Sequence, residues 1–211
     1  MDESKSLQPF GRQRQPDATK SVRQELWGVV LFVGAIWVVF AIDYFTSLDQ
    51  YGLVPRQLNG LIGVPTMTFL HADMNHLVSN TIPLFVLLGL LAGSRARSWI
   101  VVTLIILIGG VLLWVCGRDA SHKGASLLIF GLMSYLIAAG LLFERRFLSV
   151  VIALVVGFMY GMTLISGVMP QIGTRSRVSW EGHLCGAVAG VFVAYLLTRR
   201  RQGSLSSPRM T

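Results

Sequence analysis

Six runs of about twenty mostly apolar residues occupy most of this 211-residue chain and constrain its fold more than any other feature. A helix needs about 20 such residues to cross the hydrocarbon of a bilayer. Only 13% of the residues are charged, whereas soluble domains carry about 25%. The sequence therefore predicts an all-α polytopic membrane protein. The predicted spans are 27–46, 75–93, 98–117, 124–143, 147–169 and 179–198.

The two ends of the chain are more polar than the region between them. Residues 1–22 are rich in Gln, Arg, Ser and Pro, a composition typical of a disordered arm. Residues 201–211 predict a short tail, and residues 23–200 are expected to form one membrane domain. No small-residue cleavage site follows the first apolar run, so we expect no cleaved signal peptide.

Basic residues gather on one side of the predicted topology. With the N-terminus inside, thirteen of the 18 Lys and Arg residues fall in inside segments, which places both termini in the cytoplasm. A bacterial inner membrane suits a short chain of this kind. The pI near 10.2 reflects this bias. We expect no binding of nucleic acid, because no basic face interleaved with aromatic residues lies outside the tails.

The connection 47–74 mixes helix-breaking and apolar residues. Its glycines and prolines discourage one continuous helix, yet its many leucines and valines do not suit a free loop. We expect a structured element in the outer interface. Cys116 and Cys185 lie in or at the ends of apolar runs, where small packing residues are common. No zinc-type spacing occurs, so neither a metal nor a disulfide is predicted.

Polar side chains inside membrane spans need partners or a water-filled cavity, and four of them share one level here. His76 and Asn80 are four residues apart and lie on one face of the second span. Ser126 stands near the start of the fourth span, and His183 near the start of the sixth. These three spans all run from outside to inside, so the four side chains are expected at one depth in the outer half.

A serine and a histidine at one depth suggest nucleophilic catalysis. A nucleophile needs a base within hydrogen-bond reach and donors aimed at the oxyanion that forms. His183 is the candidate base for Ser126, and the Ser126 backbone N–H with His76 and Asn80 are candidate donors. Glu181 points to a different helix face from His183, so the sequence predicts a Ser–His dyad. Taken singly, each residue also suits plain helix packing.

Small residues permit the close helix approach that a dyad on two helices requires. His183 shares a face with the last two members of a small-residue stripe in the sixth span. Phe130 follows Ser126 by one turn and could stack on the imidazole. The stripe residues are Gly182, Gly186 and Gly190, and the fourth span offers Gly124, Ala125 and Gly131.

Three motifs resemble those of the rhomboid family of intramembrane serine proteases. "HADMNHLVSN" resembles the family's H-x₄-H-x₃-N, "GASLLIFG" its G-x-S-G, and "GHLCGAVAG" its His followed by G-x₃-G. They occur in the family's order over roughly residues 26–198. The resemblance implies a six-transmembrane-helix rhomboid-like bundle that cleaves transmembrane segments of other proteins within the lipid bilayer, without a cofactor.

The resemblance also implies roles for individual residues. It makes 47–74 a membrane-embedded first loop, 167–177 a cap over the site, and the fifth helix a gate. The matched residues are Ser126 as nucleophile, His183 as general base, His76 and Asn80 as oxyanion donors, Phe130 as the stacking aromatic, and His71 as a structural residue.

Leu127 departs from the family pattern, which has glycine after the serine. Its backbone N–H is retained, so the expected effect is steric, either on packing around 124–131 or on substrate access. The alternative function is a catalytically inactive rhomboid-like protein that binds transmembrane clients. A channel or transporter would need a polar path across both leaflets, and the inner halves of these spans show none.

Overall fold

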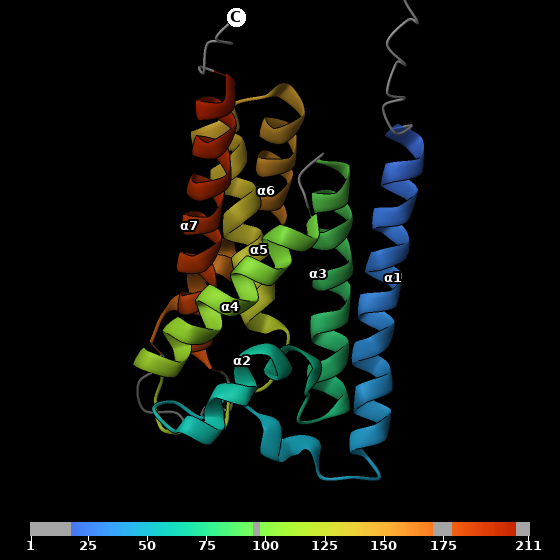
Figure 1. The fold of residues 1–211 in the computed structure, drawn as a ribbon, viewed down its shortest axis with the longest axis vertical. Helices are drawn as coiled ribbons and strands as arrows, with labels where there is room; N and C mark the ends of the chain where they lie inside the picture. The colour runs from blue at the N-terminus through green and yellow to red at the C-terminus, as the bar shows by residue number, and fades with distance from the viewer. Residues whose placement is uncertain (1–17, 95–97, 171–178, 206–211) are drawn as a thin grey trace, which may run out of the picture.

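Six long helices form the chain in the computed structural model, which describes residues 18–94, 98–170 and 179–205. Each has a segment long and apolar enough to cross a membrane, and no strand occurs among the described residues. The predicted all-α, six-span fold of a multi-pass membrane protein is confirmed (Figure 1). The helices are α1 (Ala18–Asp43), α3 (Met74–Gly93), α4 (Ser98–Cys116), α5 (Ser126–Ala138), α6 (Phe147–Val168) and α7 (Trp180–Leu205).

The end helices are longer than predicted. α1 begins at Ala18, inside the predicted arm, and α7 continues to Leu205, inside the predicted tail. Apolar runs mark the part of a helix that crosses lipid, whereas Lys, Arg, Gln and Glu are good helix formers in water, so both helices continue beyond their apolar runs. Residues 1–17 and 206–211 lie outside the described residues. α1 also ends three residues before the predicted boundary, where the Asp43 carboxylate accepts the Leu48 N–H at 2.7 Å.

α5 is the central helix of the bundle. Its span is 72% buried, whereas that of α1 is 17% buried. A helix that is apolar on all sides is expected to be enclosed by others, and α5 packs against α3, α4, α6 and α7. A π-helical segment, η4 (Ala139–Glu144), completes the span.

Glycines bring the backbones of α5 and α7 into direct contact. A Cβ atom built on Gly186 would overlap the carbonyl oxygen of Leu127, and one on Gly190 would overlap that of Gly131. Close approach through small residues is the usual route to tight helix packing in lipid, where no hydrophobic force draws helices together. The two helices that carry Ser126 and His183 are therefore the most closely packed pair.

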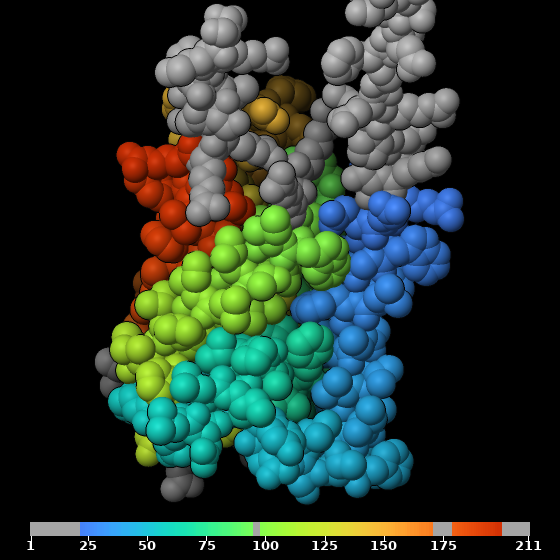
Figure 2. All heavy atoms as spheres, viewed as in Figure 1, coloured from blue at the N-terminus to red at the C-terminus, as the bar shows by residue number. Residues whose placement is uncertain are grey.

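The connection between α1 and α3 is folded, as the sequence predicts. It forms short helices across the end of the bundle where α3, α5 and α7 begin (Figures 1 and 2). Its own side chains Leu53, Val64 and Met67 are buried. Its helices are η1 (Leu48–Tyr51), η2 (Leu58–Ile62), α2 (Gly63–Thr66) and η3 (Met67–Phe69).

Gly190→Ala should destabilise the bundle, because the new methyl group would meet the rigid Gly131 backbone and force α5 and α7 apart. We expect a loss of about 1–3 kcal/mol in the free energy of unfolding, measured by denaturant titration in detergent micelles. Gly89→Ala in α3 is the matched control, since nothing lies within 4 Å of a Cβ atom there. Equal losses at the two positions would contradict the proposed contact.

Candidate active site

Ser126 is the first residue of α5 and follows a turn that the first loop holds in place. The Gly124 N–H donates to the Met67 carbonyl at 2.9 Å, and the Ala125 N–H donates to His71 Nε2 at 3.4 Å. Gly124 has a φ of +114°, a conformation that glycine adopts without steric cost. The half-buried serine therefore stands on a fixed turn at the helix N-terminus.

Donors from two helices surround this turn. The first N–H groups of a helix lack intrahelical acceptors, so the Ser126 N–H belongs to a set that can receive an anion. His76 lies against the turn, because a Cβ atom on Gly124 would be 2.6 Å from His76 Nε2. α3 thus places an imidazole beside the start of α5.

Asn80 lies one turn below His76 and is 5% exposed. Its side-chain N–H₂ donates to the His76 carbonyl at 2.7 Å, which leaves one amide hydrogen for another acceptor. Asn80, His71 and Ala125 border the same narrow gap. The four-residue spacing of His76 and Asn80 therefore brings both side chains to the turn before Ser126.

His183 is held on two sides. Its ring stacks on Phe130 with the centroids 4.0 Å apart and the planes at 4°, and its Nδ1 lies 3.0 Å from the Gly167 carbonyl oxygen. A carbonyl can only accept, so Nδ1 carries the hydrogen and the Nε2 lone pair is available as a base. Phe130 follows Ser126 by one helical turn, so both lie on the face of α5 that meets His183.

The Gly167 carbonyl fills the position behind the histidine for which the sequence offered no acidic residue. It belongs to the last turn of α6, where carbonyls lack intrahelical partners and the helix end carries partial negative charge. A Cβ atom on Gly167 would overlap the Phe130 ring. Sequence inspection missed this acceptor because it is a backbone atom. The only signal is a glycine two residues before the predicted end of the span.

No hydrogen bond joins Ser126 to His183 among the described residues. Contacts of this kind are often long in unliganded sites and tighten when substrate binds. Glu181 does not lie behind His183 and instead pairs with Arg118 at 3.6 Å. Most of the predicted cap 167–177 lies outside the described residues, namely 171–177.

The Leu127 side chain packs away from the serine. It is 2% exposed, and a Cβ atom on Gly109 of α4 would lie 2.9 Å from its Cδ2 atom. A glycine on α4 therefore makes the room that leucine needs. Leu127 in place of glycine therefore affects the packing of α5 against α4. Packing around 124–131 is one of the two steric effects that the sequence predicts.

His71 supports the turn as a neutral acceptor. Its ring lies edge-on to that of His76, with centroids 5.1 Å apart, and its Nε2 accepts the Ala125 N–H. Burial, with a smaller contribution from the neighbouring His76, lowers the pKa of His71 to about 4. The side chain therefore stays uncharged at neutral pH.

Known proteins are similar in sequence to this chain over the region that carries the site. A family model described as the Rhomboid domain matches residues 58–200. The chain belongs to the rhomboid family. An uncharacterized protein of Mycobacterium tuberculosis is 42% identical, over 90% of this chain and 84% of its own length. One from Mycobacterium leprae is 39% identical over 90% of this chain and 78% of its own length. A protein of Acanthamoeba polyphaga mimivirus that is named as a rhomboid protein is 28% identical over 82% of this chain and 93% of its own length.

Leu127→Gly would restore the family's glycine in this rhomboid chain, and we expect it to destabilise the protein. Removing the side chain leaves a cavity between α5 and α4 and should cost about 2–5 kcal/mol in unfolding free energy, measured by denaturant titration in micelles. Leu154→Gly is the control, because Leu154 is 59% exposed on α6 and its loss opens no cavity. An unchanged stability in Leu127→Gly would show that Gly109 does not receive this side chain.

Stability should fall as the pH is lowered from about 6.5 to 4. In this window the unfolded chain protonates His71 and the folded chain does not, so folding free energy is lost progressively, by roughly 3 kcal/mol in full. Burial also lowers the pKa of His122, which adds to the same trend. His71→Gln keeps an acceptor without a titrating ring, so its melting temperature should vary less across this window. A slope equal to that of the wild type would contradict the buried, neutral histidine.

Proposed function

We propose that this protein is an intramembrane serine protease in which Ser126 is the nucleophile and His183 the general base. One observation carries the proposal. The His183 imidazole is fixed by Phe130 and the Gly167 carbonyl with Nε2 unprotonated, on the helix that packs most closely against α5. Membership of the rhomboid family supports the same reading.

The proposed reaction begins when Ser126 Oγ attacks a peptide carbonyl and His183 Nε2 takes its proton. The Ser126 backbone N–H, His76 and Asn80 would stabilise the oxyanion. His183 then returns the proton to the leaving amine, and water hydrolyses the acyl-enzyme. The partial negative charge at the end of α6 stabilises the imidazolium that forms between these steps.

The proposed substrates are transmembrane segments of other proteins. A helix holds its carbonyls in i→i−4 hydrogen bonds, so the substrate must unwind near the site, and helix-breaking residues would favour this. The site lies at the end of the bundle that we propose faces outward, with both termini in the cytoplasm. Mycobacterial relatives support a bacterial inner membrane. In this proposal α6 gates lateral access to the site.

A rhomboid-like protein that binds transmembrane clients without cutting them is the second candidate. It is favoured by the lack of a Ser126–His183 hydrogen bond in the described part of the chain. In that case the fold would retain its client-binding surface while Ser126 remained unreactive. The reactivity of the serine separates the two functions.

A fluorophosphonate probe should label the wild-type protein in detergent micelles, because an activated serine oxygen displaces its fluoride and becomes phosphonylated. Labelling should disappear in Ser126→Ala and slow at least about a hundredfold in His183→Ala, where the general base is lost. Ser166→Ala, an exposed serine on α6 near Gly167, is the control and should label fully. If the probe does not label the folded wild-type protein, the protease proposal is wrong.

Asn80→Ala should slow cleavage of a reporter transmembrane substrate by about 10²–10³-fold in kcat, the usual effect of losing one oxyanion donor. Ser79→Ala is a matched control, because the Ser79 hydroxyl donates to the same His76 carbonyl at 2.9 Å from the exposed face of α3. Similar losses in both variants would indicate a role in holding α3 rather than in stabilising the oxyanion.

A further inference from the structure

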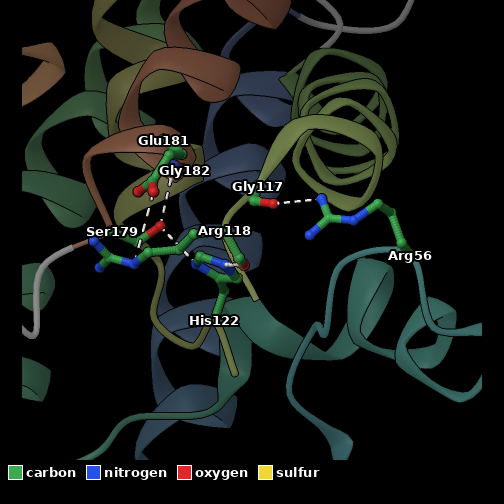
Figure 3. Close-up of polar contacts among 7 residues, drawn as sticks. All are labelled: Arg56, Gly117, Arg118, His122, Ser179, Glu181 and Gly182. Atoms are coloured by element: carbon green, nitrogen blue, oxygen red, sulfur yellow. Dashed lines mark hydrogen bonds and ion pairs between the residues drawn. The ribbon is translucent and has the colours of Figure 1, made fainter. Parts of the chain in front are cut away.

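Four polar residues at the outer end of the bundle have no part in the proposed chemistry. Figure 3 shows this outer polar cluster, which consists of Arg118, His122, Ser179 and Glu181. Arg118 and His122 lie between α4 and α5, whereas Ser179 and Glu181 lie at the start of α7. His122 and Glu181 are only 4% and 8% exposed. The cluster therefore joins the chain segments that lead into the two reactive helices.

Three hydrogen bonds run in one direction through the cluster. His122 Nε2 is 3.1 Å from the Arg118 carbonyl oxygen and Nδ1 is 2.7 Å from Ser179 Oγ. The carbonyl can only accept, so Nε2 carries the hydrogen and Nδ1 accepts the Ser179 hydroxyl. Ser179 Oγ accepts the Gly182 N–H at 3.1 Å and so caps α7. Burial lowers the pKa of His122 below its ordinary 6.5, which favours the neutral ring that these bonds need.

Two residues of the cluster precede the proposed reactive residues by the same number of positions in the sequence. His122 stands four positions before Ser126, and Ser179 stands four positions before His183. Backbone hydrogen bonds fix the segments 122–126 and 179–183. His122 pairs with Leu53 through two backbone hydrogen bonds of 2.8 and 3.0 Å, and the His183 N–H donates to the Ser179 carbonyl at 3.1 Å. A displacement at the cluster would therefore carry through to the side chains that react.

The second link between the two segments is weaker. Arg118 Nε lies 3.6 Å from Glu181 Oε1, and the Arg118 side chain is 39% exposed. Ion pairs in contact with water contribute little. The buried bond between His122 and Ser179 is therefore the main side-chain tie between these segments among the described residues.

We propose that His122 and Ser179 are positioning residues that set where the His183 imidazole lies relative to Ser126. Neither touches the reacting atoms. Ser179 fixes the first turn of α7, and His122 ties that turn to the segment that enters α5. The expected effect of these two residues on catalysis rests on the proposed protease function. Their effect on the orientation of His183 does not depend on that function.

The orientation of His183 can be measured without any activity. The stack on Phe130 should shift the His183 ring-proton signals upfield in spectra of histidine-labelled protein, which holds only four histidines. His122→Ala and Ser179→Gly should both move these signals toward their ordinary positions. Glycine is also tolerated at the N-cap position, so Ser179→Gly should remain folded even if His122→Ala does not.

The fluorophosphonate labelling rate measures the consequence for Ser126. Displacement of a reactive group by about 1 Å can cost about a hundredfold, so we expect labelling to slow about ten- to a hundredfold in either variant. The double variant should be no slower than the singles, because both remove the same bond. Ser179→Thr, which keeps the hydroxyl, should recover most of the rate. Arg56→Gln is the control: Arg56 Nη1 donates to the Gly117 carbonyl at 2.6 Å without touching α7 (Figure 3).

The two measurements separate the positioning role from the protease function. Unchanged His183 signals in Ser179→Gly would overturn the positioning role whatever the labelling rate. Shifted signals with unchanged labelling would overturn its catalytic consequence. A wild type that does not label would overturn the protease proposal, while the spectra of Ser179→Gly would still decide whether the cluster places His183.

Discussion

The backbone contact between α5 and α7 is the interaction on which the rest of the structure depends. Helices in lipid gain no hydrophobic energy from touching, so their association relies on close packing. Gly186 and Gly190 remove the side chains that would keep the helices apart. This close approach lets the Phe130 ring, on the same face of α5 as Ser126, lie flat against the His183 imidazole of α7.

The serine turn depends on the first loop in the same way. Met67 and His71 accept the N–H groups of Gly124 and Ala125, and Leu53 pairs with His122. These bonds satisfy polar backbone at the end of the bundle and fix the direction in which α5 begins. The loop that covers the end of the bundle where α3, α5 and α7 begin is therefore part of the support of the site.

Much of the architecture could be predicted from the sequence because the membrane imposes a simple rule. Apolar runs of sufficient length predict spans whose ends lie within two residues of the helices, if η4 is counted with α5 and apart from the ends of α1 and the final turns of α7. The His76 and Asn80 spacing likewise follows from helical periodicity. Shared depth predicted which side chains could meet, although it could not show whether Ser126 reacts.

The remaining features depend on tertiary contacts that one-dimensional patterns do not carry. The acceptor for His183 Nδ1 is a backbone carbonyl of Gly167, which any residue type possesses. The Leu127 side chain could be placed only once Gly109 was known to face it. His122 and Ser179 lie 57 residues apart, and each resembles an ordinary polar residue in a connection. α1 begins before its apolar run and α7 ends after its own, because polar residues continue a helix in water as readily as apolar residues do in lipid.

The hydrogen bond from His183 to Gly167 has a mechanical consequence. α6 is the helix that holds the acceptor, and much of its surface faces outward, with Phe158 93% exposed and Met162 77% exposed. The tilt of a lipid-facing helix responds to the thickness of the surrounding hydrocarbon. A change of tilt that carried the α6 end away would free Nδ1 and release the ring from its tautomer. In the proposed protease, the readiness of His183 to act as the base would thus depend on the thickness of the bilayer as well as on the protein around it.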